Sequence, residues 1–252
     1  MRGGYGRLSG APQGAWVDIQ NSLTMIVQGD PAMFPLGDDN SQRRTVPVVT
    51  VVLIAINVIM FVIELSAGDE FIQAFAFVPA RFAEAPAAEA YTIFTAMFLH
   101  GGWMHLFGNM LFLWIFGDNV EDRLGHPQFL FFYLLTGVVA TLAQFAISPH
   151  SSIPNVGASG AIAGVLGAYI LMFPQSRVNV LMGRQVVAMP AVIVLGMWIA
   201  IQLFSEVGAI ASTDQTTETG GVAYMAHIGG FAAGFAMALL FRNRLDPGQT
   251  AT

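Results

Sequence analysis

The chain has 252 residues, of which 55% are hydrophobic and only 10% are charged, whereas an ordinary soluble domain carries about 25% charged residues, so the composition argues against a soluble fold. It contains no cysteine and no lysine, which excludes disulfides, thiolate metal sites, a cysteine nucleophile and lysine Schiff-base chemistry. The net charge of -6 offers no basic stripe for nucleic acid, and we expect no nucleic-acid partner.

Residues 1–45 are mixed in composition, and we predict that they form a cytoplasmic N-terminal tail that is partly disordered. Six apolar segments follow, most of them near the roughly 20 residues that a helix needs to cross a bilayer. They predict an all-α, polytopic membrane protein: a six-transmembrane-helix bundle in a membrane domain at 46–242, then a short cytoplasmic C-terminal tail at 243–252. The predicted spans are 47–65, 103–117, 128–147, 159–173, 186–204 and 223–241.

The first span begins at Pro47, because a proline at the first helical position gives up no helical hydrogen bond. The connection from Ser66 to about Thr95 mixes prolines, acids and apolar patches, and we expect a structured loop at the membrane surface. The second and fourth spans are short, which fits helices buried inside a bundle better than helices that face lipid.

Arginines predict the orientation, because positively charged short loops stay on the cytoplasmic side. The loops 148–158 and 205–222 contain no lysine or arginine, and the long first loop has only Arg81. Both termini are therefore expected to be cytoplasmic. The arginines on that side are Arg43, Arg44, Arg123, Arg177, Arg184, Arg242 and Arg244.

Polar side chains inside membrane spans are functional candidates by default, because their burial in hydrocarbon is unfavourable. Four of them lie near the non-cytoplasmic ends of spans two, four and six: His105, Asn109, Ser159 and His227. At 1.5 Å per residue, all four fall within roughly 10 Å of that face. Three segments that are far apart in sequence are thus expected to supply polar groups at one depth.

A spacing of four residues places His105 and Asn109 on one helical face, where both can donate hydrogen bonds toward the same point. They could stabilise an oxyanion, or they could be a polar pair that holds two helices together. We interpret His100, near the mouth of this span, as a structural residue within the loop. The segment has no HExxH motif and no carboxylate at a suitable spacing, so we predict no metal site and no cofactor.

Ser159 opens the fourth predicted span within the segment GASGA. A serine at a helix start has free backbone N–H groups and the positive end of the helix dipole beside it, which favours negative charge that develops nearby. This position suits a nucleophile that forms a tetrahedral intermediate. The alternative is that the serine simply caps the helix.

His227 lies about one turn into the sixth span and shares a face with glycines. Small residues let two membrane helices approach closely, and a Ser–His hydrogen bond of about 2.6 to 3.2 Å requires such an approach. The glycines are also explained by packing alone, and both interpretations require close helices. The glycines of this candidate substrate or packing motif are Gly157, Gly160, Gly164, Gly230 and Gly234.

Three segments, in this order, resemble the motifs of the rhomboid family of intramembrane proteases: HGGWMHLFGNMLFLWIFGDNVEDRLG, GASGAIAGVLGAY and AHIGGFAAGF. The resemblance covers about residues 47 to 241 and makes 46–242 a rhomboid protease membrane domain of the prokaryotic six-span type. It implies that Ser159 is the nucleophile and His227 the base of a dyad, and that His105, Asn109 and the Ser159 backbone N–H form the oxyanion hole. It also implies a structural role for Glu121 and Arg123.

Two features depart from the family pattern and bear on the first loop and on the orientation of the histidine. A Trp-Arg pair found in the first loop of many members is missing, and Ala163 stands where some members carry a tyrosine. No acidic third member of the dyad is evident, since Glu206, Asp214 and Glu218 all fall in the predicted loop before the sixth span.

The resemblance implies a serine endopeptidase that cleaves transmembrane segments of other membrane proteins near the outer leaflet. Its partners would be those substrates and the lipid bilayer, with no metal, and its location the prokaryotic plasma (inner) membrane. Loop 205–222 and span five, with Trp198 and Phe204, are a candidate gate. Two alternatives of other classes remain: a transporter, and a noncatalytic binding protein or chaperone for membrane helices.

Overall fold

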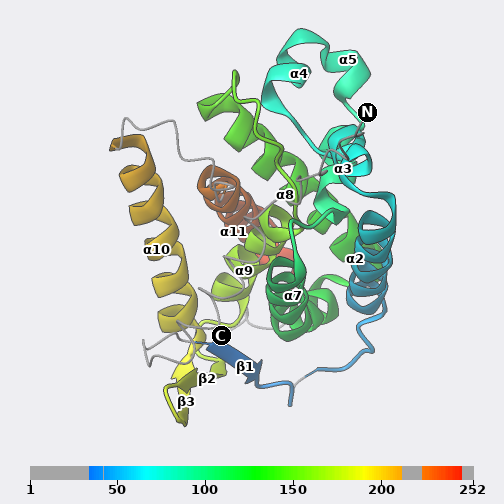
Figure 1. The fold of residues 1–252 in the computed structure, drawn as a ribbon. Helices are drawn as coiled ribbons and strands as arrows, with labels where there is room; N and C mark the ends of the chain where they lie inside the picture. Colours follow the sequence, from blue (N-terminus) through cyan, green and yellow to red (C-terminus); the bar gives the residue numbers. More distant parts are fainter. Residues whose placement is uncertain (1–33, 42, 212–222, 246–252) are drawn as a thin grey trace, which may run out of the picture.

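The structure is a computed structural model that describes residues 34–41, 43–211 and 223–245. Helices dominate it, and a small sheet lies at one end (Figure 1). Its elements in chain order are β1 (Phe34–Asp38), α2 (Val48–Ala67), α3 (Asp69–Phe75), α4 (Pro79–Glu84), α5 (Pro86–Glu89), α6 (Thr92–Thr95), the 3-10 helix η1 (Ala96–Phe98), α7 (Trp103–Leu124), α8 (His126–Ile147), α9 (Ser159–Met172), β2 (Arg177–Met182), β3 (Gln185–Pro190), α10 (Ala191–Ala211) and α11 (Tyr224–Leu245).

Helix α9 lies at the centre of the bundle. Every residue from Gly160 to Tyr169 is buried, and α7, α8 and α11 pack around it (Figure 1). A helix of 14 residues that is apolar on all sides requires protein neighbours all round, which this position supplies. The prediction that the fourth apolar segment is a buried central helix is confirmed.

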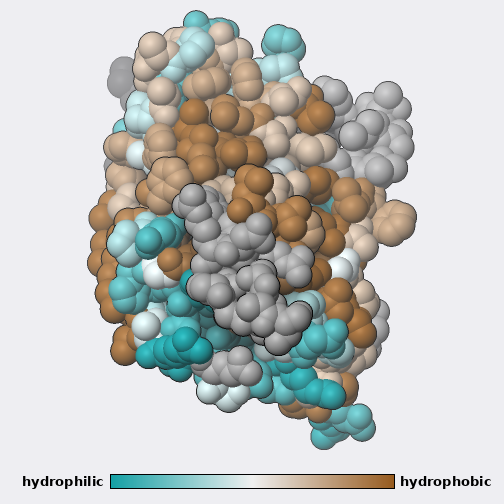
Figure 2. All heavy atoms as spheres, turned by 180° about the vertical axis from the view of Figure 1, so that it is seen from behind, coloured by the Kyte–Doolittle hydropathy of each residue, from teal (hydrophilic) through white to brown (hydrophobic). Residues whose placement is uncertain are grey.

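Two helices in the described part of the chain are long and apolar enough to cross a membrane, α2 and α8. Three further helical segments are apolar but shorter: Ser159–Met172, Ala191–Phe204 and Tyr224–Leu240. The count of six spans stays a prediction. In Figure 2 hydrophobic residues cover much of the visible surface, and hydrophilic ones gather at the end where the sheet lies in Figure 1.

The all-α prediction is wrong in one respect, because three strands form an antiparallel sheet in the order β1-β2-β3. Along β2 the side chains of Val178 and Val180 are buried while Arg177 and Asn179 are exposed, which is the period-2 pattern of a strand with one buried face. A two-residue turn joins β2 to β3, and Gly183 within it has φ +61°, as such turns require. Strand β1 adds part of the predicted N-terminal tail to this sheet.

Two predicted spans need new bounds. The second continues well beyond residue 117, since α7 runs to Leu124 through its charged end. The fifth does not begin at residue 186, because residues 185–190 pair with β2 and the helix begins only at Ala191, after Pro190. Both errors arise because the spans were predicted from hydrophobicity alone. A hydrophobicity pattern ends a helix at its first charged residues even where those residues are still helical, and it does not distinguish an apolar strand from an apolar helix.

The connection that precedes α7 is ordered, as the sequence predicted. It folds into the short helices α3 to α6 and η1, and Arg81 ties it together by donating to the carbonyl oxygen of Ala76 at 2.9 Å and pairing with Glu89 at 3.0 Å. A backbone bridge between Phe77 and Asn155 joins it to the segment that precedes α9. The connection therefore supports one side of the central helix.

Polar contacts fix the helices at the sheet end. The fully buried carboxylate of Glu121 accepts hydrogen bonds from the backbone N–H groups of Val49 and Thr50 at 2.8 and 2.7 Å, and from the Thr50 hydroxyl. It thus caps the first turn of α2 from a neighbouring helix. Asp118 pairs with Arg43 at 2.7 Å, which holds the chain between β1 and α2 against α7.

Helices α9 and α11 are in direct backbone contact. A Cβ atom built on Gly234 would overlap the carbonyl oxygen of Gly164, and one on Gly230 would overlap that of Gly160. Gly167 makes the reciprocal contact with the carbonyl oxygen of Phe231. Only glycine permits this approach, which brings the helix that begins with Ser159 against the helix that carries His227.

Gly234→Ala should lower the free energy of unfolding by about 1–3 kcal/mol or more, because the added methyl group must displace a backbone carbonyl that cannot rotate away. Gly196→Ala on α10 is the matched control, since nothing lies within 4 Å of its Cβ position and alanine favours a helix by about 0.5–1 kcal/mol. Thermal unfolding in one detergent compares them. Equal midpoints for the two variants would contradict the packing argument.

Asp38 should make the attachment of β1 sensitive to pH. Burial raises the pKa of its carboxyl from 3.8 to about 6, although the Tyr169 hydroxyl donates to it at 2.5 Å. Because the folded state then binds the proton more tightly than the unfolded chain, stability is greatest below about pH 4 and falls as pH rises to about 6.

Asp38→Asn should reduce this fall, measured as the thermal midpoint from pH 4 to 7; the carboxyl of Asp118, whose pKa burial also raises, contributes to what remains. Asp39→Asn should not reduce the fall, because a hydrogen bond from Ser41 lowers the pKa of Asp39 and gives a slope of opposite sign. A fall of unchanged size in Asp38→Asn would show that Asp38 does not contribute to it.

Candidate active site

The structure brings Ser159 and His227 together. Ser159 is the first residue of α9, and His227 lies in the first turn of α11. Their Oγ and Nε2 atoms are 2.8 Å apart, which is the reach of a hydrogen bond between a nucleophile and its base. His227 is buried and Ser159 is half-buried, so the pair is partly screened from water.

A residue that the sequence analysis missed, Gln202 of α10, holds the other side of the imidazole. Its Oε1 atom is 2.8 Å from His227 Nδ1. An amide oxygen only accepts, so the proton of the neutral ring lies on Nδ1 and the lone pair of Nε2 faces the Ser159 hydroxyl. This is the tautomer that a general base needs.

His105 lies on the other side of the serine. Its Nδ1 atom accepts a hydrogen bond from the Gly101 N–H at 3.3 Å, so its ring proton is on Nε2 and that atom is a donor. A Cβ atom on Gly157 would lie 2.7 Å from His105 Nε2 and 3.6 Å from Ser159 Oγ, so both groups border one point. Gly157 also has φ +127°, which disfavours any other residue there.

Asn109 is one turn further along α7 and is held by His100. Asn109 Nδ2 donates to His100 Nε2 at 3.0 Å, and a second amide proton remains for another acceptor. The His100 backbone N–H donates to the buried carboxylate of Glu64, at 3.1 Å from each oxygen. The prediction that His100 acts within the loop is therefore incomplete, since its ring also positions a residue of α7.

The backbone adds donors beside the hydroxyl. Ser159 begins α9, and the N–H groups of a first helical turn have no partner inside the helix. Together with the Nε2–H of His105, which borders the same point as Ser159 Oγ, they give several donors beside the hydroxyl. The arrangement suits an oxygen that gains negative charge as a nucleophile attacks a carbonyl.

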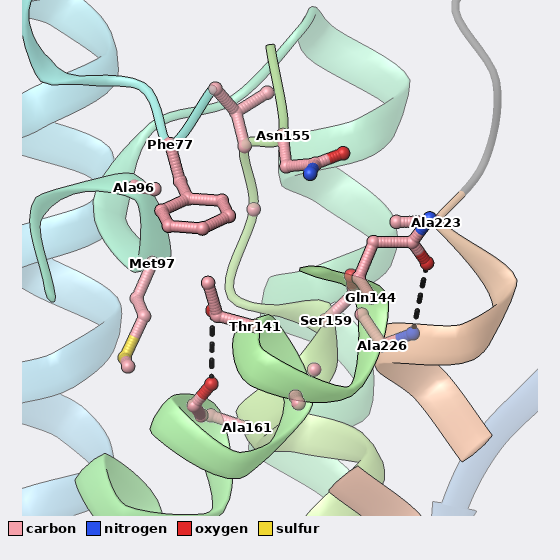
Figure 3. Close-up of a pocket in the computed structure, with 15 residues that line it drawn as sticks. Phe77, Ala96, Met97, Thr141, Gln144, Asn155, Ser159, Ala161, Ala223 and Ala226 are labelled. Carbon is pink, nitrogen blue, oxygen red and sulfur yellow. Dashed lines mark hydrogen bonds between the residues drawn. The ribbon is translucent and has the colours of Figure 1, made fainter. Parts of the chain in front are cut away.

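A pocket opens beside Ser159 (Figure 3). Its walls are mainly apolar or small, apart from Gln144 and Asn155, and Phe77 and Met97 are its largest apolar side chains. Gln144 of α8 reaches the start of α11, where its Oε1 atom accepts from the Ala226 N–H at 3.3 Å. The pocket can accept a small side chain next to the nucleophile.

The predicted glycines lie at two places in the structure. Gly160, Gly164, Gly230 and Gly234 lie at the contact of α9 with α11, and Gly157 lies between His105 and Ser159. Of the three acids expected in the loop before the sixth span, Glu206 lies instead in α10, since this helix continues to Ala211, and Asp214 and Glu218 lie outside the described residues. No group of three His, Asp or Glu side chains able to hold a metal ion occurs in residues 34–41, 43–211 and 223–245.

Known proteins resemble this chain over much of its length. The Rhomboid domain model matches residues 87–244, which contain the serine, both histidines and the asparagine. The chain belongs to the rhomboid family. As a rhomboid protein with long apolar helices, it is an integral membrane protein.

Individual relatives cover the chain to different extents. Rhomboid protease GluP of Bacillus subtilis is 32% identical over 197 residues, which are 77% of this chain and 35% of that protein. The chloroplastic Rhomboid-like protein 11 of Arabidopsis thaliana is 40% identical over 82 residues, 32% of this chain and 29% of its own length. Putative rhomboid protease YdcA of B. subtilis is 33% identical over 84 residues, which are 33% of this chain and 42% of that protein. The chain therefore spans less than half the length of these relatives.

Ser159 should react with a fluorophosphonate probe in the folded protein, because His227 can take its proton. His227→Ala should slow this labelling by about 10²–10⁴-fold, the usual contribution of a general base. Ser152→Ala and His150→Ala, which replace exposed residues of the same types, should label like the wild type. In-gel fluorescence gives the rate, and labelling that persists in Ser159→Ala would show that another residue reacts.

Proposed function

We propose that the protein is an intramembrane serine endopeptidase that cleaves transmembrane segments of other membrane proteins. The observation that carries the proposal is the 2.8 Å contact between Ser159 Oγ and His227 Nε2, with the proton of His227 held on Nδ1 by Gln202. Membership of the rhomboid family and the similarity to GluP and YdcA, which are named as proteases, support it.

The reaction follows the logic of acyl transfer. Neutral His227 takes the proton from Ser159 as the serine oxygen attacks the scissile carbonyl, and the tetrahedral oxyanion accepts hydrogen bonds from the Ser159 N–H, His105 and Asn109. The protonated His227 then gives its proton to the leaving amine. Water, activated by the same imidazole, hydrolyses the acyl-enzyme and restores the serine.

The substrate must present a peptide bond in extended form, because helical backbone groups are occupied by their own hydrogen bonds. The small, mainly apolar pocket beside Ser159 favours a small side chain next to the scissile bond. A bond near the end of a transmembrane helix unwinds most easily, because the terminal turns lack part of their hydrogen bonds. We propose that the site lies near the outer leaflet of a prokaryotic plasma membrane and that both termini are cytoplasmic. The segments that carry arginine include Arg43, Arg123 and Arg177, and they lie toward the end of the molecule that holds the sheet, away from Ser159 (Figure 1). Arginine-rich segments stay on the cytoplasmic side, which supports this orientation.

Cleavage of a single-span protein with a small residue near its outer end, in liposomes, tests the proposal. Ser159→Ala and His227→Ala should abolish cleavage, whereas Ser152→Ala and His150→Ala should retain it. His105→Ala and Asn109→Ala should each lower kcat by about 10²–10³-fold with a smaller effect on KM, because an oxyanion donor acts mainly in the transition state. Product mass locates the cut bond.

Cleavage that Ser159→Ala does not reduce would contradict the proposed chemistry. Binding of a membrane helix by both wild type and Ser159→Ala, with no cleavage by either and no probe labelling of Ser159, would instead identify a noncatalytic binding protein.

A further inference from the structure

We propose that Gln202 is a positioning residue for the base and that it makes the active tautomer of His227 depend on where α10 lies. The proposal rests on the proposed function, since it assigns a third member to the same site. Gln202 does not touch the reacting atoms. It acts through the imidazole, whose Nδ1 atom it contacts at 2.8 Å.

Gln202 is exceptional within its helix. From Ala191 to Phe204 the side chains of α10 are otherwise apolar, apart from the indole N–H of Trp198. The neighbours Ile201, Leu203 and Phe204 are 57%, 47% and 79% exposed, as expected of a helix that faces lipid at the edge of the bundle (Figure 1). A side-chain amide in such a helix is unfavourable unless its hydrogen bonds are made, and Gln202 meets this requirement at His227.

Three contacts together define the position of the imidazole. Ser159 holds Nε2, Gln202 holds Nδ1, and the Trp198 ring lies 5.7 Å from the imidazole at an angle of 41°. Two of the three come from α10. Without Gln202 the proton is free to move to Nε2, and the ring then points a donor instead of a lone pair at the serine.

The position of α10 therefore controls the base. Ser159 and the backbone of His227 are fixed by the glycine contact between α9 and α11, which lies in the buried centre. Helix α10 lies outside this centre, and on its N-terminal side it continues directly from strand β3. A displacement of α10 by more than the reach of a hydrogen bond removes the Nδ1 partner and leaves the nucleophile in place.

Gln202→Leu and Gln202→Glu distinguish the effect of the hydrogen-bond acceptor from the effect of side-chain size. Leucine removes the acceptor, and kcat in the liposome cleavage assay should fall by about 10- to 100-fold, part of the 10²–10⁴-fold of a general base, with KM nearly unchanged. The rate of fluorophosphonate labelling at Ser159 should fall with it. Glutamate keeps an oxygen acceptor in either protonation state, and it should recover most of both rates.

Ile201→Ala is the matched control on the adjacent, outward-facing position and should change neither rate. The ring-nitrogen NMR shifts of His227, assigned by their loss in His227→Ala, give a readout that needs no activity. The wild type should show the Nδ1–H tautomer, and Gln202→Leu should show a mixture of tautomers.

Wild-type rates in Gln202→Leu, or no recovery in Gln202→Glu, would overturn the proposal. So would an equal loss in Ile201→Ala, which would indicate a general effect on α10. If the wild type cleaves nothing and the NMR result is as expected, the proposed function fails while the role of Gln202 in holding the ring stands.

Discussion

The backbone contact between α9 and α11 is the constraint on which the site depends. Glycine at positions 164, 230 and 234 lets two helices approach until only main-chain atoms separate them, and this fixes the distance between Ser159 and His227. In a bilayer such packing is also a main source of stability, because lipid chains are as apolar as the side chains they would replace. The same contact therefore stabilises the fold and aligns the reacting groups.

Several buried polar groups elsewhere hold a partner in place through the hydrogen bonds that they make. Glu121 caps α2 from α7, and Glu64 holds the backbone of His100, whose ring holds Asn109. In an apolar surrounding an unpaired carboxylate or amide is far less favourable than in water. These pairs therefore specify the relative placement of α2, α7 and the loop between them more sharply than the apolar contacts do.

Much of this arrangement was predictable from the sequence. Apolar length located the helices, and the polar residues inside them named the serine, two histidines and the asparagine. What was missed needed information that a hydropathy pattern does not hold. The strand at 185–190 carries the apolar run VVAM directly before an apolar helix, and only the alternation in RVNVLM and the glycine turn point to a hairpin. Gln202 is the polar residue in the fifth apolar segment, and this position could have marked it as a candidate. Its partner His227 could not be predicted, because a contact across 25 residues depends on how α10 is rotated against α11.

The site thus has two parts. One part is fixed by the buried helices α9 and α11, and the other consists of the side chains of the outer helix α10 that contact the His227 ring. Ser159, its helix N-terminus and the backbone of His227 belong to buried, glycine-packed helices, so a change in their geometry is unfavourable. The orientation of the imidazole belongs to α10, an outer helix whose side chains near Gln202, at Ile201, Leu203 and Phe204, are exposed. An enzyme that admits a transmembrane helix from the bilayer must open toward lipid somewhere. An opening at α10 would expose Ser159 while His227 is not aligned with it. The return of α10 would align His227 again once the substrate is in place. Substrate entry and hydrolysis would then use two different positions of α10.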